Sequence, residues 1–429
     1  MKAQRLRDLL QTWNRFCGKT MKIVLVHNTY QQPGGEDVVF ESEKRLLERA
    51  GHHVVPYVRS NKELASVSGL GRIAIVSQML WSSDSRRDFA AVLDEEHPEI
   101  VHIHNTFMVI SPSIYSACRE RGIPVVQTLH NYRLLCPASN FYRDGRVCEE
   151  CVEHGLLRSV RYGCYRHSRE ATAGVALMIA VHRQLNTWRE CVTCFITLTE
   201  FARQRFIAAG FPSNKFVVKP NFVDPDPGER SGSGEYAVYV GRLAEDKGLG
   251  VLLDAWKRVG GQYPLQIVGD GPERAMLEAR VRDWGLSGIT FRGLLSRADA
   301  IAAVKNARFT VVPSTWYETF GMCIAESFAC GTPVVCSRLG AMAEIVTDRC
   351  DGLHFTPGDA EDLASKVKWA WRHPEELAEM GRAGRRKYER DYTAEKNYSL
   401  LMGIYEQTVA AHESQAVLDS QLEVSRSVT

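Results

Sequence analysis

The stretch Ala307–Ser337, ARFTVVPSTWYETFGMCIAESFACGTPVVCS, holds the unit from which this fold is built. It starts with an apolar run of strand length, ARFTVVPS, and continues through an aromatic loop, TWYETFG. MCIAESFACG then has the composition of a buried helix that ends at Gly331, and TPVVCS starts a second apolar run. Strand, loop, helix and strand in this order predict a βαβ unit, and hence a parallel sheet.

The same alternation occurs in both halves of the chain. From Met21 the apolar runs KIVLVHN, HHVVPYVR, EIVHIHN and PVVQTLHN are separated by amphipathic segments, and the second half contains YAVYVGRL, LQIVGDG, ITFRGLL and TPVVCSR. This repetition predicts an α/β fold with two Rossmann-like, doubly wound domains. Two such domains facing one another create an interdomain cleft, which is a favoured place for a ligand.

A change in composition separates the two halves. The stretch PDPGERSGSGE is rich in Pro, Gly and Ser, as linkers are. We expect a first domain, a linker, a second domain, a crossover helix that packs back on the first domain, and a flexible tail, over residues 21–224, 225–235, 236–390, 391–412 and 413–429 respectively. Residues 1–20 are interpreted either as an appended amphipathic helix or as a mis-assigned start upstream of Met21.

The overall composition limits the classes of protein to consider. Of 429 residues, 45% are hydrophobic and 24% are charged, which is typical of soluble globular proteins. The net charge of +2 gives no reason to expect a nucleic-acid partner. No apolar run reaches the roughly 18 to 20 residues that span a bilayer, and the N-terminus lacks the apolar region of a secretion signal. We therefore expect a cytoplasmic protein.

Two stretches have the chemistry of phosphate binding. In VGRLAEDKG a strand ends at Gly241, and Arg242 and Lys247 follow in the loop before a helix, where two cations and free helix amides suit a diphosphate. Gly34 and Gly35 follow the first strand at the start of a helix, where the backbone can approach a phosphate closely. The alternatives are a solvated charged loop and an ordinary turn.

The opening stretch also contains two glutamates that suit a polyhydroxyl ligand. Glu318 lies in the predicted loop, and Glu326 lies about two turns into the helix. Phe320 and Gly321 place backbone amides at the N-terminal end of that helix. One carboxylate can bind hydroxyls of a ligand in the loop, and the other a more distant hydroxyl pair. The alternative is a helix-start carboxylate and a solvated one.

The ordered set of these motifs resembles the retaining glycosyltransferases of family 4. PGGED, GRLAEDKG, the E-x7-E spacing from Glu318 to Glu326, GTPVV and GAMAEIV…DGLHFTPGD carry the resemblance, which covers nearly the whole chain from Met21. It implies the GT-B fold and hexosyl transfer from a nucleotide-diphosphate sugar, bound mainly by the second domain. The acceptor would be a saccharide or a lipid-linked glycan in cell-surface polysaccharide assembly.

The resemblance also assigns roles to individual residues. Arg242 and Lys247 match the diphosphate-binding pair, Glu326 the carboxylate on the ribose, and Glu318 the glutamate beside the sugar ring. His130, at a strand end, resembles the histidine near the transferred sugar, and His104 is a further candidate. The implied catalytic set is Glu318, Arg242, Lys247 and His130, and the implied donor-binding set is Gly34, Gly35, Gly241, Phe320, Gly321 and Glu326.

The expected reaction needs no metal cofactor. Arg242, Lys247 and the helix amides can stabilise the negative charge on a departing diphosphate by preorganised electrostatics. Nothing in the chain resembles the paired aspartates that hold a divalent ion beside a diphosphate. Retention would call for a nucleophilic carboxylate in a glycosidase, but no residue can be given that role. We therefore expect attack on the same face, with the leaving phosphate aiding deprotonation.

A cysteine-rich insertion lies in the first half. Twelve cysteines without a secretion signal indicate a reducing compartment. Cys148 and Cys151 form C-x2-C, and Cys136 and Cys164 could complete a four-thiolate structural zinc site that fixes a loop at the cleft rim. Free thiols or a reversible disulfide are the alternatives. An HNYRLLCP and C-x2-C insertion resembles a subset of family 4 enzymes that act in polysaccharide assembly.

A basic segment with an apolar centre follows the insertion. Residues 156–190 contain six arginines against two glutamates and enclose AGVALMIAV. This combination could place the first domain on an anionic membrane, on the inner face of the cytoplasmic membrane, where a lipid-linked acceptor would lie. The alternative is a buried helix with a solvated basic edge.

Two other function classes stay open at this point. A nucleotide-sugar epimerase also occurs on GT-B folds, and conversion of the sugar without an acceptor would distinguish it. A non-catalytic, cysteine-rich binding protein would not need the cationic pair and both glutamates. A dinucleotide dehydrogenase is disfavoured, because no complete G-x-G-x-x-G follows the first strand.

Overall fold

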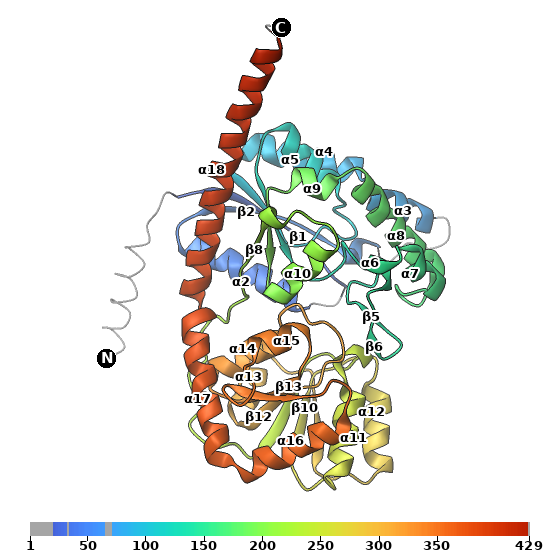
Figure 1. Ribbon diagram of the computed structural model, residues 1–429, viewed down its shortest axis with the longest axis vertical. Coiled ribbons are helices and arrows are strands. Elements are labelled where there is room, and N and C mark those ends of the chain that lie inside the picture. The colour runs from blue at the N-terminus through green and yellow to red at the C-terminus, as the bar shows by residue number, and fades with distance from the viewer. Residues whose placement is uncertain (1–19, 32–33, 65–70, 428–429) are drawn as a thin grey trace, which may run out of the picture.

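The computed structural model describes residues 20–31, 34–64 and 71–427. The N-terminal stretch with two interpretations therefore lies almost wholly outside the described residues. Figure 1 shows two α/β domains stacked one above the other, joined along one side by the last two helices.

The first domain contains a parallel six-stranded sheet in the order β2-β1-β3-β4-β7-β8. Its β1 pairs with β2 from Lys22 opposite His53 to Thr29 opposite Ser60. A small hairpin, β5–β6, lies apart from the sheet. The elements are β1 (Lys22–Thr29), α2 (Gly35–Arg49), β2 (His53–Ser60), η1 (Asn61–Leu64), α3 (Gly71–Leu80), α4 (Ser83–Glu96), β3 (Ile100–Ile103), α5 (Ser113–Glu120), β4 (Val125–Leu129), β5 (Tyr142–Arg143), β6 (Arg146–Val147), α6 (Glu150–Glu153), α7 (Leu157–Tyr162), α8 (Arg169–Gln184), α9 (Thr187–Cys191), β7 (Cys194–Thr197), α10 (Glu200–Ala208), η2 (Ser213–Lys215) and β8 (Phe216–Val218).

The second domain contains another parallel six-stranded sheet, in the order β11-β10-β9-β12-β13-β14. The predicted βαβ stretch forms β12, α14 and β13, with Thr310 opposite Val334. The elements are β9 (Tyr236–Val240), η3 (Glu245–Lys247), α11 (Leu249–Arg258), β10 (Leu265–Val268), α12 (Arg274–Asp283), β11 (Ile289–Gly293), α13 (Arg297–Lys305), β12 (Ala307–Val312), α14 (Met322–Ala329), β13 (Val334–Ser337), α15 (Gly340–Ile345), β14 (Gly352–Phe355), α16 (Ala360–Arg372), α17 (Pro374–Asp391) and α18 (Ala394–Ser427).

Both sheets are doubly wound, which confirms the predicted fold class. In each, the strand order reverses beside the first strand, between β1 and β3 and between β9 and β12. Ligands of open parallel sheets bind outside the carboxyl ends of the strands at such a reversal. The strands that meet there are buried on both faces, as the near-continuous burial of β1 and β12 shows. The loops that follow β1, β3, β9 and β12 are thus placed to build a site.

The helix α18 returns to the first domain. Leu401 and Tyr405 pack with Ile23, Leu25 and Phe40 in one apolar cluster. The helix runs along the edge of the first domain and projects beyond it (Figure 1). It reaches Ser427, so the segment expected as a flexible tail continues the helix, because its sequence contains neither Gly nor Pro.

The two places where the chain passes between domains lie side by side. Val223, before the linker, donates its backbone N–H to the carbonyl of Tyr392, which separates α17 from α18, at 3.0 Å. The Tyr388 hydroxyl donates to the Val223 carbonyl at 3.3 Å. In the linker itself, Asp226 accepts two hydrogen bonds of 2.7 Å from the guanidinium of Arg385 on α17. The linker and the crossover are therefore bonded to each other and to the second domain.

None of the described helices combines the length and the apolar composition that crossing a bilayer requires.

Candidate active site

The cationic loop after β9 meets the loop after β12. Lys247 Nζ lies 2.6 Å from Glu318 Oε1, and its ammonium is 4.7 Å from the centre of the Trp316 ring. Among the residues that the structure describes, the Arg242 side chain makes only a 3.5 Å contact, with Asp246 Oδ2, and 60% of it is exposed. Lys247 is thus paired within the site, whereas the Arg242 guanidinium is available to a ligand.

The carboxylate of Glu318 is held rigidly through one oxygen. Its Oε1 accepts hydrogen bonds from Lys247 Nζ, from Ser314 Oγ at 2.8 Å and from Trp316 Nε1 at 3.1 Å. Within the described residues Oε2 has no hydrogen-bond donor, so this oxygen can bind a ligand hydroxyl. The sequence did not indicate roles for Ser314 and Trp316, although both stand in the same strand-to-helix loop as Glu318.

Two helices start at this point with free amides. Gly321, which precedes α14, has a φ of 83°, a left-handed conformation that glycine adopts without strain. Gly248, which precedes α11, packs so closely that a Cβ would lie 2.0 Å from the Pro313 carbonyl oxygen. The first amides of an α-helix have no partner within the helix. The Phe320 side chain is buried at 2% exposure, so only its backbone can face a ligand.

Glu326 lies in the second turn of α14 and is half-buried. It makes no hydrogen bond or ion pair with the described side chains. Burial raises its pKa to about 7, which Arg297 on the neighbouring α13 partly offsets. A carboxylate that is desolvated but unpaired is suited to accept hydrogen bonds from hydroxyl groups.

The first domain contributes the start of α2. A Cβ on Gly34 would lie 3.8 Å from its nearest neighbour, and a Cβ on Gly35 would meet nothing within 4 Å. The protein's own packing therefore does not require glycine here. The next residue, Glu36, accepts hydrogen bonds from Asn105 at 2.9 Å and Asn131 at 3.2 Å, and burial raises its pKa to about 7. The sequence prediction missed Glu36, whose signal is its place directly after the glycine pair.

His130 connects the two halves of the site. Its backbone carbonyl accepts a 2.8 Å hydrogen bond from Thr319 Oγ1, in the loop of the second domain that carries Glu318. Its ring Nε2 lies 2.9 Å from His104 Nδ1. Because Asn131 also binds Glu36, the structure brings His130, Glu36 and the Glu318 loop together. Gly241 lies at the start of the cationic loop, where a Cβ would lie 2.9 Å from the hydroxyl of Tyr239.

A pocket of the first domain opens beside His130. Its lining includes Thr106, Gln127, Asn131 and Arg133 with several apolar side chains. Gln127 is buried, and its Oε1 has no hydrogen-bond partner among the described residues. An unpaired buried acceptor costs free energy, so the pocket is suited to a ligand that donates a hydrogen bond there.

The insertion lies at the cleft rim but does not gather its four thiols. The thiols of Cys136 and Cys151 are neighbours, and the interaction with Cys151 lowers the pKa of Cys136. In the described part of the chain, no three of the four sulfur atoms, those of Cys136, Cys148, Cys151 and Cys164, lie within 4.8 Å of one another. This arrangement does not fit a tetrahedral four-thiolate site, and the zinc stays a prediction.

A residue next to these cysteines reaches the second domain. Glu149 accepts hydrogen bonds from Tyr317 at 3.0 Å and from Arg205 at 3.1 Å. Two more contacts cross between the domains, since Glu344 accepts from the backbone amides of Glu200 and Phe201 at 2.8 and 2.7 Å.

The basic segment contains both hydrogen-bonded and exposed arginines. Arg183 and Arg189 donate to backbone carbonyls, those of Leu134 and Gly210, as a structural role requires. Three other arginines, Arg161, Arg166 and Arg169, are exposed on and around α7 and α8. Exposed apolar side chains occur on the same two helices: Leu157, at the start of α7, is 83% exposed, and Leu185, just after α8, is 60% exposed.

The fold and the site define a two-domain protein of the GT-B class, with a cationic loop and two glutamates at the strand-order reversal. Residues 33–227 match the family model described as Glycosyltransferase Family 4, and residues 224–387 match that of the glycosyl transferases group 1. The chain therefore belongs to glycosyltransferase family 4.

Curated relatives match different shares of the chain. The D-rhamnosyltransferase WbpZ of Pseudomonas aeruginosa is 32% identical over 161 residues, which is 37% of this chain and 42% of that protein. The O-antigen chain mannosyltransferase C of Escherichia coli is 28% identical over 172 residues, 40% of this chain and 46% of that protein. The matches thus span about half the length of these relatives. The 2-deoxystreptamine glucosyltransferase of Streptomyces kanamyceticus is 26% identical over 383 residues, 88% of this chain and 92% of that protein.

Solved structures share the whole fold. Anabaena HepE in complex with UDP superposes with a TM-score of 0.65 at 19% identity, covering 90% of this chain and 100% of that one. The sucrose-phosphate synthase of Thermosynechococcus elongatus superposes with a TM-score of 0.68 at 18% identity, covering 91% and 100%. These similarities support the GT-B architecture.

Proposed function

We propose that the protein is a retaining glycosyltransferase that transfers a hexosyl group from a nucleotide-diphosphate sugar to a saccharide or lipid-linked glycan. The observation that carries the proposal is the Lys247–Glu318 pair, which joins the cationic loop to a carboxylate with one free oxygen. The cationic loop suits a diphosphate on one side of this pair, and the free oxygen of Glu318 suits a hydroxyl of the attached sugar on the other side.

The donor would lie mainly on the second domain. Arg242 and the first amides of α11 and α14 are available for phosphate oxygens, and Lys247 adds a second cation. Glu326 has an unpaired carboxylate for the ribose hydroxyls. The room beside Gly34 and Gly35 allows the first domain to close on the phosphates. The relative HepE, whose structure holds UDP, supports a nucleotide donor.

The chemistry follows from these charges. As the bond to the sugar breaks, negative charge grows on the diphosphate, and Arg242, Lys247 and the helix amides are oriented in advance to stabilise it. We infer that the transfer needs no metal ion, because these groups supply the positive charge. Glu318 is a poor nucleophile even through its free Oε2, since three donors on Oε1, one of them the Lys247 ammonium, withdraw negative charge from the carboxylate. Attack by the acceptor on the same face as the departing diphosphate therefore accounts best for retention.

The acceptor would bind in the first domain, in the pocket beside His130. Gln127 Oε1 can accept a hydrogen bond there from a hydroxyl group of that substrate. The relative named O-antigen chain mannosyltransferase C supports a role in polysaccharide assembly. An epimerase is not favoured, because the named relatives are transferases, and a purely binding role leaves the Lys247–Glu318 pair without a purpose.

We infer that the exposed surface of α7 and α8 rests on anionic lipid at the inner face of the cytoplasmic membrane. Arg161, Arg166 and Arg169 supply charge, and Leu157 and Leu185 supply apolar contact. Co-sedimentation with vesicles should rise with the fraction of anionic lipid and fall when the three arginines are replaced by Gln. Binding that does not depend on anionic lipid would contradict this surface.

The first test is a panel of nucleotide-diphosphate sugars, with and without EDTA, in which donor binding and slow nucleotide-diphosphate release are measured. One donor should be preferred, its turnover should survive EDTA, and Glu326→Ala and Lys247→Ala should weaken it. Lys366→Ala, on the remote α16, is the matched control. No binding of any nucleotide sugar by folded protein would refute the proposal.

A further inference from the structure

A buried line of polar side chains runs behind His130. On α2, Glu43 is 1% exposed, and its Oε1 accepts a hydrogen bond from the equally buried Lys219, which follows β8. Its other oxygen lies 3.3 Å from Nε2 of His104, which follows β3. His104 Nδ1 in turn lies 2.9 Å from Nε2 of His130, which follows β4. Four separate elements thus supply one chain of contacts that ends at the candidate active site.

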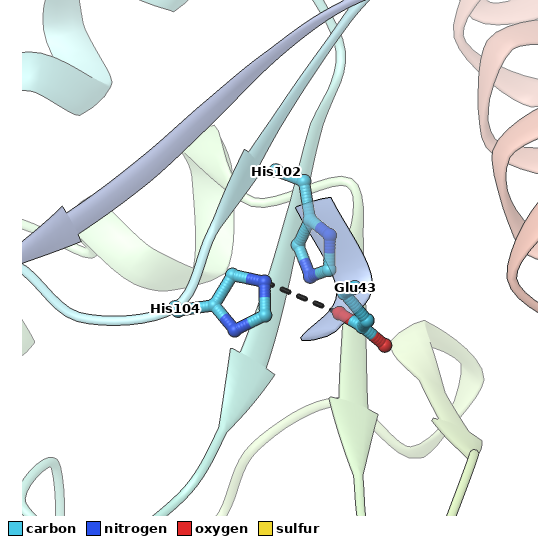
Figure 2. Close-up of side chains that lie close together, drawn as sticks. All are labelled: Glu43, His102 and His104. Atoms are coloured by element: carbon cyan, nitrogen blue, oxygen red, sulfur yellow. Dashed lines mark ion pairs between the residues drawn. The ribbon is translucent and has the colours of Figure 1, made fainter. Parts of the chain in front are cut away.

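Part of this cluster has the residue types of a metal site. Figure 2 shows Glu43, His102 and His104 pointing toward one another, and their ligand atoms lie within 4.8 Å. However, the ammonium of Lys219 already pairs with the carboxylate and would repel a second cation. Both ring nitrogens of His102 are hydrogen-bonded to hydroxyl groups, at 2.7 and 2.8 Å. A metal ion is therefore disfavoured here, and the contacts within the cluster define where its protons lie.

The proton between Glu43 and His104 can be placed. Burial alone would raise the pKa of Glu43, but the Lys219 ammonium and the His104 contact hold it well below its usual range. Glu43 is therefore an ionised carboxylate and can only accept. Glu43 Oε2 and His104 Nε2 lie 3.3 Å apart, and within the described chain neither atom has a hydrogen-bond partner on any other residue or a well-aligned hydrogen bond to the other. A lone pair on Nε2 would leave two buried acceptors facing each other, so Nε2 carries a proton.

The arrangement of His104 determines that of His130. Burial lowers the pKa of His104, so its ring is neutral and holds a single proton, on Nε2. Its Nδ1 is then an acceptor, and His130 must donate from Nε2. Burial and the neighbouring His104 lower the pKa of His130 well below its usual range, so this ring is neutral too. The remaining nitrogen, His130 Nδ1, has a lone pair and no partner among the described residues.

We propose that Glu43, His104 and Lys219 are positioning residues that fix His130 as its neutral Nε2–H tautomer, with Nδ1 presented as a hydrogen-bond acceptor to a hydroxyl of the transferred sugar. The identity of that ligand rests on the proposed function, whereas the tautomer does not. Lys219 keeps Glu43 ionised, Glu43 orients His104, and His104 leaves His130 one possible proton position.

Replacing Glu43 by Gln should reverse the direction in which protons are donated along the contacts from residue 43 through His104 to His130. The amide has nearly the same shape, and its oxygen can face Lys219 while its N–H group donates to His104 Nε2. His104 would then carry its proton on Nδ1 and donate to His130 Nε2, which moves the proton of His130 to Nδ1. The group presented to the sugar would change from an acceptor to a donor.

Nuclear magnetic resonance of ¹⁵N-histidine-labelled, ligand-free protein tests this, because ring couplings report which nitrogen holds the proton. His130→Asn assigns the signal, and His52→Gln, in a separate buried contact with Tyr398, is the control. We expect the His130 proton on Nε2 in the wild type and on Nδ1 in Glu43→Gln. A wild-type proton on Nδ1, or no change in Glu43→Gln, would overturn the proposal. If that variant does not fold, Glu43→Gln/Lys219→Met removes the unpaired charge and should show the same shift.

Nucleotide-diphosphate release by the same proteins distinguishes the two proposals. We expect kcat/KM for the donor to fall about tenfold in Glu43→Gln, as the loss of one hydrogen bond predicts, and to stay within about twofold in His52→Gln. If the histidines show the expected tautomers but no nucleotide sugar yields free nucleotide diphosphate, the proposed function is refuted. The positioning roles of Glu43, His104 and Lys219 would still stand. Release together with the opposite wild-type tautomer would refute the positioning chain alone.

Discussion

Replacing Glu326 by Gln should stabilise the folded protein at alkaline pH and leave its stability near pH 4.5 unchanged. Burial raises the pKa of this carboxyl from 4.5 to about 7, so the folded chain resists an ionisation that the unfolded chain undergoes freely. The stability that this group contributes is present below the unfolded pKa and is lost as pH rises through 7. At about 1.4 kcal/mol per pKa unit the loss is of order 3 kcal/mol by about pH 8.5.

Urea unfolding followed by circular dichroism between about pH 5 and 8.5 measures this difference. Glu406→Gln, an exposed change on α18, is the control. The same Glu326 variant should bind the donor about 10- to 150-fold more weakly, because hydrogen bonds to a charged group contribute about 1.5–3 kcal/mol. A stability gain that does not grow with pH would show that the carboxylate is not desolvated. A gain without weaker donor binding would remove Glu326 from the donor site.

Three further predictions concern the cationic loop, the glycine pair and the thiols. Lys247→Ala should lower donor turnover about 10²- to 10³-fold, as the loss of one preorganised donor does, while Lys366→Ala should leave it unchanged; a loss below about threefold would contradict the assigned role. Gly34→Ala should change the unfolding free energy by less than about 0.5 kcal/mol, because the protein leaves room for the methyl group. It should weaken donor binding, measured by calorimetry, at least about tenfold, because the bound ligand would not leave that room. Equal donor affinity would show that no ligand approaches Gly34. Mild oxidation should link Cys136 to Cys151, seen as a cross-linked peptide pair by mass spectrometry, whereas one equivalent of bound zinc that protects both thiols would instead support the four-thiolate site.

Local patterns were enough to predict the fold. The apolar runs and the helix that ends at Gly331 in the stretch 307–337 depend on neighbours a few residues away, and they formed the expected βαβ unit. The same local signal pointed to Arg242, Lys247 and the two glutamates, because loops at strand ends build the ligand crevice of a parallel sheet.

Long-range pairing could not be predicted in this way. Glu43 and Lys219 are 176 residues apart, and each reads in sequence as an ordinary charged surface residue. Their burial depends on how α2 and the end of β8 pack. The contact of Lys247 with Glu318 likewise needs the loops after β9 and β12 to meet, which spacing along the chain does not reveal. The approach of Cys136 to Cys151 is a third case, since the spacing left a four-thiolate site, free thiols and a reversible disulfide open.

The hydrogen bond between Val223 and Tyr392 has a mechanical consequence. Because the chain's two passages between the domains lie side by side, the domains can rotate about that one place without stretching a second connection. A rotation there would shift the other polar contacts between the domains, those of Thr319 with His130 and of Glu149 with Tyr317. Entry of a substrate by such a rotation would break those polar contacts and leave the pivot intact.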